Sequence, residues 1–147
     1  MDERLLAAYL ASAYQVRLPQ GGRATIRIGE PLPQALAELA GAQAWGFITA
    51  WNPASSPHPR RWNRQVQREL LAALRELPAA RLIRAGAGFG NGWRESSLFI
   101  VGADTTALDT LARRFGQHAY VHGDGAGGRA LLRRMDKPDS VFGQSPG

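Results

Sequence analysis

The run AWGFITAW (Ala44–Trp51) constrains the fold more than any other segment, because it is apolar almost throughout. Such a run lacks the alternation of a half-exposed strand and is typical of a central strand that is buried on both faces. Asn52 and Pro53 follow it directly, and a residue before proline is held out of helical geometry. We therefore expect a buried central strand that stops abruptly and opens into a loop.

Weaker patterns on either side of this run predict the other elements. Alternating apolar and polar residues indicate half-buried strands, and apolar residues three and four apart indicate amphipathic helices. Strands are predicted at Tyr14–Leu18, Ala24–Ile28 and within ARLIRAGAG, SSLFIVG, HAYVH and RALLRRM; helices are predicted at the N-terminus, at Gln34–Ala42, at Trp62–Leu77 and after Asp104. The order α-β-β-α-β-α-β-β-α-β-β predicts an α+β sandwich, with a mixed or antiparallel sheet covered by helices. We expect one domain at residues 1–135 and a loose C-terminal tail at 136–147.

Composition narrows the functional classes. The net charge of +6 invites a nucleic-acid interpretation, but 17 of the 18 basic residues are arginine and alanine and glycine are abundant, as in the product of a GC-rich coding sequence. The basic residues therefore form either a solvated surface or a functional patch. The chain has no cysteine and no apolar run of about 18 residues. With no signal-like N-terminus, these features predict a cytoplasmic protein without a membrane partner.

The stretch AGAGFGNGWRESS has alternating glycines, Gly86, Gly88, Gly90 and Gly92, but lacks the spacing of a dinucleotide-binding or phosphate-binding loop. It is interpreted either as a flexible hairpin loop or as a loop that closes over a ligand. Glu95, near its end, is the candidate catalytic residue, as a general base or as a group that orients a ligand. The alternative is a surface ion pair between Glu95 and Arg94.

Histidine and serine give little support for a metal site or a hydrolase. His118 and His122 flank Tyr120 and would share one strand face, but a zinc site needs a third or fourth ligand. Ordinary sheet histidines are the preferred interpretation, so we expect no metal and no cofactor. No G-x-S-x-G motif is present, which removes the basis for a hydrolase triad.

The loop after the central strand is the strongest candidate for ligand binding. Ser55 or Ser56 can cap the next helix, with Pro57 or Pro59 in its first turn. Capping does not account for Thr49, Asn52 and Asn63 beside tryptophans. A strand end that meets a helix N-terminus is a place where amide donors and the helix dipole converge on anions.

Three segments together resemble the recurring blocks of a bacterial domain-of-unknown-function family of short, single-domain proteins. The blocks are FITAWNPASS, GWRESSLFIVG and ARRFGQHAYV, and the resemblance extends roughly from Tyr14 to Leu132. The chain departs from the family pattern at His118, where asparagine is more frequent, and at Ser96, where proline is. The resemblance implies a common pocket built from polar residues and no particular reaction. The matching residues are Thr49, Asn52, Pro53, Ser55, Asn63, Trp93, Glu95, Ser97, Phe115, Gly116 and Gln117.

We therefore predict a pocket for a small polar or anionic ligand between the loops 49–63 and 88–97. Its predicted ligand-binding residues are Thr49, Asn52, Ser55, Asn63, Trp93, Arg94, Ser97 and Gln117. Two alternatives stay open: a nucleic-acid-binding module that uses arginines such as Arg60, Arg61, Arg64 and Arg68, and a protein-interaction or regulatory module. Whether the chain is an enzyme is left open.

Overall fold

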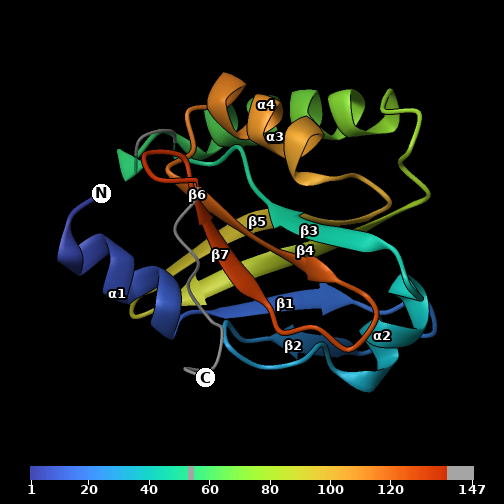
Figure 1. Ribbon diagram of the computed structural model, residues 1–147. Coiled ribbons are helices and arrows are strands. Elements are labelled where there is room, and N and C mark those ends of the chain that lie inside the picture. Colours follow the sequence, from blue (N-terminus) through green and yellow to red (C-terminus); the bar gives the residue numbers. More distant parts are fainter. Residues whose placement is uncertain (53–54, 139–147) are drawn as a thin grey trace.

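The computed structural model describes residues 1–52 and 55–138 (Figure 1). Pro53 and most of the predicted tail, residues 139–147, lie outside the described residues. The predicted order of helices and strands is confirmed. The elements are α1 (Glu3–Ala11), β1 (Ala13–Arg17), β2 (Arg23–Ile26), α2 (Gln34–Ala40), β3 (Ala44–Ile48), α3 (Arg60–Arg75), β4 (Leu82–Gly90), β5 (Trp93–Val101), α4 (Thr105–Arg114), β6 (Ala119–Asp124) and β7 (Leu131–Arg134).

The seven strands form one antiparallel sheet in the order β2-β1-β4-β5-β3-β6-β7. The sheet curls so strongly that its two ends approach each other. Gly29, after β2, donates a backbone hydrogen bond to the carbonyl of Ala130, before β7, and the Ala130 amide donates to the carbonyl of Glu30, both at 2.9 Å. The architecture is α+β, with a sheet close to half of a barrel.

The curl creates two apolar cores, one on each face. Alternation along β5 shows the division, because Leu98 and Ile100 pack with α3 and α4 while Phe99 and Val101 face the inside of the curl. Four of the five β3 residues are buried, which agrees with the prediction of a central strand buried on both faces. That strand ends at Ile48, and the predicted continuation through Trp51 has left the ladder.

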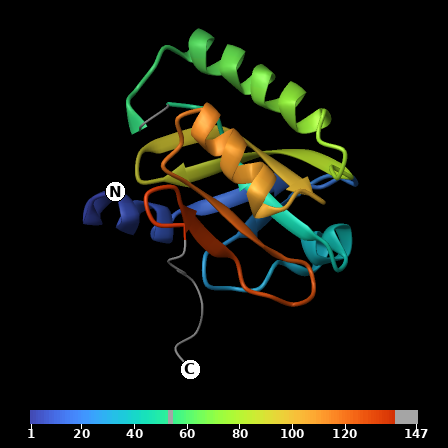
Figure 2. The ribbon, with the colours of Figure 1, turned by 45° about the horizontal axis from the view of Figure 1, so that its top comes forward.

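The helices cover less of the sheet than the sequence predicts. Figures 1 and 2 show α3 and α4 on the same side of the sheet, while α2 lies at its lower end and α1 projects at the side. α3 contacts β5 and α4 contacts β6. On that same face Arg17, Arg23 and Ala85 stay exposed on β1, β2 and β4. The other face needs little helical cover because the sheet curls around its own side chains and those of α2.

The glycine stretch is part of a long hairpin, so its interpretation as a loop is wrong. β4 and β5 pair without interruption from Leu82 opposite Val101 to Gly90 opposite Trp93. Only Asn91 and Gly92 remain for the turn, and Gly92 has a φ of +79° that favours glycine. The indole of Trp93 covers the glycines of its partner strand, and a Cβ on Gly90 would lie 2.0 Å from its Nε1. The alternation of glycines thus makes room for an aromatic ring.

A buried polar cluster, which the sequence did not predict, fastens α4 to β6 and β7. Asp109 is 8% exposed and accepts two hydrogen bonds from Arg133, at 2.8 and 2.7 Å, and one from the Tyr120 hydroxyl at 2.8 Å. Burial by itself would raise the pKa of Asp109. The hydrogen bonds from Arg133 and Tyr120 outweigh burial and lower that pKa.

Candidate functional site

The segment after β3 is held to both β5 and α3. The Thr49 hydroxyl donates to the carbonyl of Ser96 at 2.7 Å, and its oxygen accepts from the amide of Trp51 at 3.0 Å. The amide of Ala50 donates to Oε1 of Gln67 on α3 at 2.9 Å. Gln67 was not among the predicted site residues, since nothing in a helical glutamine signals that it binds a strand end.

Asn52 and Asn63 form a reciprocal pair at the start of α3. The amide of Asn52 donates to Oδ1 of Asn63 at 2.9 Å, and Nδ2 of Asn63 donates back to Oδ1 of Asn52 at 2.8 Å. The amide of His58 donates to the same Asn52 oxygen at 3.1 Å. Asn52 and Ser55 have φ angles of +46° and +58°. Left-handed geometry at residues other than glycine persists only where its surroundings fix it, and such strain concentrates at functional sites.

Glu95 closes this polar network from β5. Nδ2 of Asn52 donates to its Oε2 at 3.1 Å. Burial raises the pKa of Glu95, and the hydrogen bond from Asn52 lowers it by a smaller amount. Tyr9 of α1 lies in the same environment: burial and the charge of Glu95 raise its pKa to about 12, against a hydrogen bond from Ser55. Tyr9 was missed because an apolar helical stripe gives no reason to separate it from core residues.

The predicted site residues divide between the two faces of β5. Successive side chains of a strand point to opposite faces, so Trp93, Glu95 and Ser97 share one face and Arg94 lies on the other. Arg94 donates to the hydroxyl of Ser96 at 3.3 Å and lies 5.8 Å from the ring centre of Phe89. The alternative of an ion pair between Glu95 and Arg94 is therefore wrong.

The remaining predicted residues bind backbone. Gln117 is buried and donates from Nε2 to the carbonyls of Trp51 at 3.1 Å and Phe115 at 3.2 Å. The hydroxyl of Ser97 donates to the carbonyl of Glu95 at 3.1 Å. Asn52, Asn63 and Glu95 thus come into direct contact, and Gln117 supports the same loop one residue away.

On the Arg94 face a cavity of about 520 Å³ lies between α3 and β5. We call it the arginine cavity. Its lining residues are Trp51, Arg60, Arg64, Gln67, Arg68, Leu71, Arg94, Ser96 and Leu98, with no carboxylate among them. Three of the arginines recur every four residues, which places them on one side of α3. Their spacing was visible in the sequence, where the same residues supported the nucleic-acid alternative.

Two lining side chains of the arginine cavity carry buried N–H groups that lack an acceptor among the described residues. These are the indole Nε1 of Trp51 and Nε2 of Gln67. The amide of Gln67 cannot simply be turned round, because its Oε1 accepts from the backbone of Ala50. An unsatisfied buried donor costs about 1–3 kcal/mol.

The start of α3 also differs from the prediction. The helix begins at Arg60 with Pro59 at its N-cap, and no side chain in the described part of the chain caps it. Ser55 and Ser56 therefore lie too far upstream to act as the predicted cap. The N–H groups of the first turn receive no side-chain acceptor, so the positive end of the helix dipole adds to the charge of Arg60 and Arg64.

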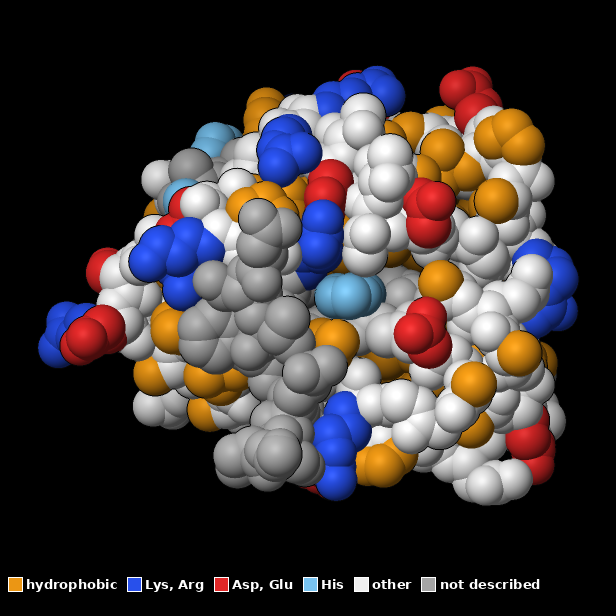
Figure 3. Space-filling view, viewed as in Figure 1, with side chains coloured by type: hydrophobic (Ala, Val, Ile, Leu, Met, Phe, Trp, Pro, Cys, Tyr) orange, Lys and Arg blue, Asp and Glu red, His pale blue; other side chains and the backbone are white. Residues whose placement is uncertain are grey.

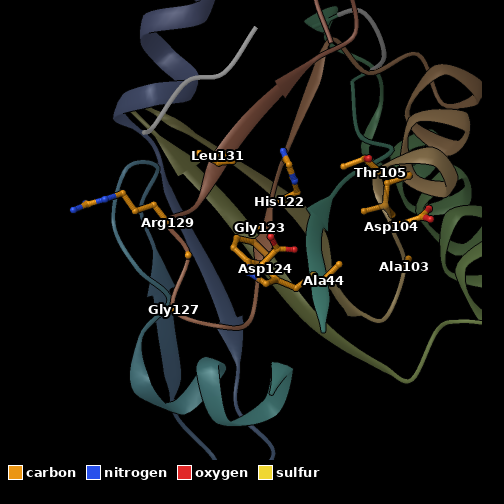
Figure 4. Close-up of a pocket in the computed structure, with 13 residues that line it drawn as sticks. Ala44, Ala103, Asp104, Thr105, His122, Gly123, Asp124, Gly127, Arg129 and Leu131 are labelled. Atoms are coloured by element: carbon orange, nitrogen blue, oxygen red, sulfur yellow. The ribbon is translucent and has the colours of Figure 1, made fainter. Parts of the chain in front are cut away.

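A second cavity of about 610 Å³ lies away from all predicted site residues, between the start of α4 and the β6–β7 hairpin. Figure 3 shows a histidine side chain in a hollow on this face, with acidic side chains nearby. In the close-up, Asp104 and Thr105 lie on one side of His122, and Leu131 and Arg129 on the other (Figure 4). Burial lowers the pKa of His122, and the nearby Arg133 lowers it further. This cavity has carboxylates on its wall and lacks the concentration of cations found at α3.

Within residues 1–52 and 55–138, no group of three or more histidine, aspartate or glutamate side chains is placed to hold a metal ion. The same part of the chain has no helix that combines the length and the apolar character needed to cross a membrane.

Comparison with known families gives a match to the family described as protein of unknown function (DUF3293), over residues 48–120. The matched range holds the second block seen in the sequence and all but one residue of the first and of the third. No curated protein and no solved structure matches the chain. The matched range includes β3's last residue, the polar network, α3 and both strands of the long hairpin.

Proposed function

We propose that the protein, which matches a family of unknown function over residues 48–120, binds a small anionic ligand in the arginine cavity. The observation that carries the proposal is the convergence of Arg60, Arg64, Arg68 and Arg94 on one cavity without a carboxylate in its lining. The positive guanidinium groups repel one another, and an anion bound between them is attracted to each of them, which offsets this repulsion. Guanidinium groups bind phosphates and carboxylates through paired hydrogen bonds.

Two further features support an anion with acceptor oxygens. The uncapped N-terminus of α3 adds backbone N–H groups beside Arg60. Trp51 and Gln67, which line the cavity, carry buried N–H groups without an acceptor among the described residues. Buried donors without an acceptor destabilise the fold, so a ligand oxygen that accepts from them recovers this free energy as binding affinity.

The polar network of Asn52, Asn63 and Glu95 has a positioning role in this proposal. It fixes the segment that carries Trp51 and the start of α3, which carries Arg60 and Arg64. Glu95 lies on the opposite face of β5 from the arginine cavity. We therefore assign Glu95 to holding the loop, and the proposal is of a binding protein without an assigned reaction.

A second candidate function is binding of single-stranded nucleic acid along the outer side of α3. The observation that favours it is Trp62, which is 41% exposed and stacked on His58 with ring centres 4.4 Å apart. Exposed aromatic rings beside arginines are the usual platform for unpaired bases. Affinity for such a partner falls steeply as salt rises.

Calorimetric titration with glucose 6-phosphate and with an oligothymidylate tests both functions. We expect one-to-one binding of the phosphate monoester, and loss of at least about tenfold in affinity in Arg64→Gln and in Arg94→Gln, because each removes a charge-assisted hydrogen bond. Arg4→Gln, on α1 and outside the cavity, is the matched control. Undiminished binding in both cavity variants contradicts the proposal. Tight oligothymidylate binding that Trp62→Ala removes favours the second candidate.

A further inference from the structure

The arginine cavity adjoins a smaller cavity, which lies on the same face of the sheet. This neighbouring cavity has a volume of about 260 Å³ and shares Gln67, Arg94, Ser96 and Leu98 with the first. We call it the sheet cavity. Its other lining residues are Gln15, Arg17, Arg23, Ala85, Gly86, Ala87, Phe89 and Ser97, again without a carboxylate.

Strand register places Gln15, Arg17 and Ser96 on one face of the sheet, and the side chain of Ser97 lies on the other. Ser96 of β5 lies opposite Ala87 of β4, and Ala87 lies opposite Gln15 of β1. Arg17 follows Gln15 by two residues and therefore points to the same side. The small side chains of Ala85 and Ala87 on β4 form the floor between β5 and β1.

The far end of the sheet cavity carries a second concentration of positive charge. Arg17 and Arg23 lie directly opposite each other in the β1–β2 ladder. Like charges in this position destabilise a sheet, so the pair costs free energy in the unliganded protein. Both side chains line the sheet cavity, and a second anionic group at this end would remove that cost.

The two groups of arginines are separated by a distance that a small molecule can span. Neighbouring strands lie about 4.8 Å apart, so β1 is about 10 Å from β5 across β4. With the two-residue advance from Gln15 to Arg17, the Cα atoms of Ser96 and Arg17 lie about 12 Å apart. Between them Gln15, Gln67 and Ser96 offer uncharged hydrogen-bonding groups.

We propose that the ligand is an elongated small molecule with an anionic group at each end and a hydroxyl-rich uncharged middle, the chemistry of a bisphosphorylated sugar or polyol. One end binds in the arginine cavity and the other between Arg17 and Arg23. This inference rests on the proposed function, because it extends the same binding site. It adds a requirement for a second anionic group at a set distance.

Calorimetry with glucose 6-phosphate and glucose 1,6-bisphosphate, at one fixed ionic strength, tests this inference. We expect the bisphosphate to bind at least about tenfold more tightly, because the second phosphate binds intramolecularly once the first is held. The double variant Arg17→Gln/Arg23→Gln is expected to reduce the bisphosphate to the affinity of the monophosphate while leaving the monophosphate unchanged. Arg4→Gln is expected to change neither, and thermal unfolding checks that each variant is folded.

The outcomes separate the two proposals. Equal affinities for the two sugars in the wild-type protein, with monophosphate binding lost in Arg64→Gln, overturn the extended site and leave the proposed function intact. A bisphosphate advantage that survives Arg17→Gln/Arg23→Gln also overturns the extended site. Absence of binding of both sugars contradicts both proposals.

Discussion

At the scale of single residues, Asn52 connects three residues from different parts of the chain, Asn63, His58 and Glu95. Its backbone amide donates to Asn63, its side-chain Oδ1 accepts from Asn63 and His58, and its Nδ2 donates to Glu95. Its backbone is left-handed. Asparagine tolerates this conformation better than other residues with a Cβ. Asn52 was predicted as a site residue because capping does not account for it and because it follows a strand end that meets a helix N-terminus. Its left-handed backbone was not predicted.

We expect Asn52→Ala to lower the free energy of unfolding by about 2 kcal/mol, because it removes the side-chain hydrogen bonds and strains the left-handed backbone. Asn52→Gly loses the same hydrogen bonds but tolerates the conformation, so a loss nearer about 1 kcal/mol is expected. Urea denaturation of both variants measures the difference. Equal losses would show that the backbone conformation contributes nothing.

Glu95 predicts a pH dependence of stability whose sign follows from its raised pKa. In the window between the ordinary glutamate pKa and the raised value, the folded state holds the proton while the unfolded state releases it. The stabilising contribution is therefore complete below the ordinary pKa and is lost as the pH rises through the raised one. Glu95→Gln keeps a hydrogen-bond acceptor for Asn52 and cannot titrate.

We expect the stability of Glu95→Gln relative to wild type to increase as the pH rises from 4 towards 7. Urea denaturation across this range is the measurement. A difference between the two proteins that stays constant with pH would mean that Glu95 does not titrate differently in the folded and unfolded states.

At the scale of elements, the β4–β5 hairpin gives the sharpest comparison between sequence and structure. Alternating glycines normally weaken a strand, so the sequence favoured a loop. What compensates is non-local: the Trp93 ring covers Gly90, and β1 approaches Gly86 so closely that a Cβ there would lie 2.4 Å from the carbonyl oxygen of Gln15. Neither contact can be read from local propensity.

Gly86→Ala and Gly88→Ala form a matched pair within β4. At Gly86 the obstacle is backbone, which cannot move aside, so we expect a loss of about 2–3 kcal/mol in the free energy of unfolding. At Gly88 the nearest atom to an added Cβ is 3.6 Å away, and the change is expected within about 0.5 kcal/mol. Thermal denaturation ranks the two variants, and equal destabilisation contradicts the argument.

The junction of α4 with β6 and β7 depends on Asp109. We expect Asp109→Asn to destabilise the fold by about 3 kcal/mol, because Arg133 loses its carboxylate in a largely buried position. The double variant Asp109→Leu/Arg133→Met leaves no unpaired charge and is expected to recover part of that loss. Chemical denaturation compares them. A double variant less stable than Asp109→Asn would show that the ion pair itself is strongly stabilising.

At the scale of the whole molecule, local patterns were sufficient to predict the α+β class and the order of elements. Pairing between strands that are not neighbours in the chain was not predictable, because β3 pairs with β5 and β6 while β1 pairs with β4, and no short-range signal selects these partners. The candidate site likewise was predictable in part from local patterns and in part only from the fold. Asn52, Asn63 and Glu95 were identified by residue type and position, whereas the separation of Glu95 from Arg94 depended on knowing that β5 begins at Trp93.

The positive charge of the whole molecule also predicts an effect on its stability. With a net charge of +6 and Arg17 opposite Arg23, repulsion between positive charges destabilises the folded protein. We expect Arg23→Gln to stabilise it by a few tenths of a kcal/mol, more at low ionic strength, where screening is weak. Arg4→Gln provides the reference for removing one exposed charge. Denaturation at two salt concentrations measures the effect, and a loss of stability in Arg23→Gln contradicts it.

The strand order also determines when each strand can pair during synthesis of the chain. Of the ladders in the sheet, only β1–β2 joins strands that leave the ribosome one directly after the other within the first eighty residues. β1 can pair with β4, and β3 with β5, only after the later strand has been synthesised. At ordinary translation rates this takes several seconds after the earlier strand has been made. Throughout that interval the apolar strand β3 has no partner strand on either side, because both of its partners, β5 and β6, come later in the chain. The nascent chain therefore exposes this apolar strand until β5 has been made, and the sheet can curl closed only after residue 130 has been made.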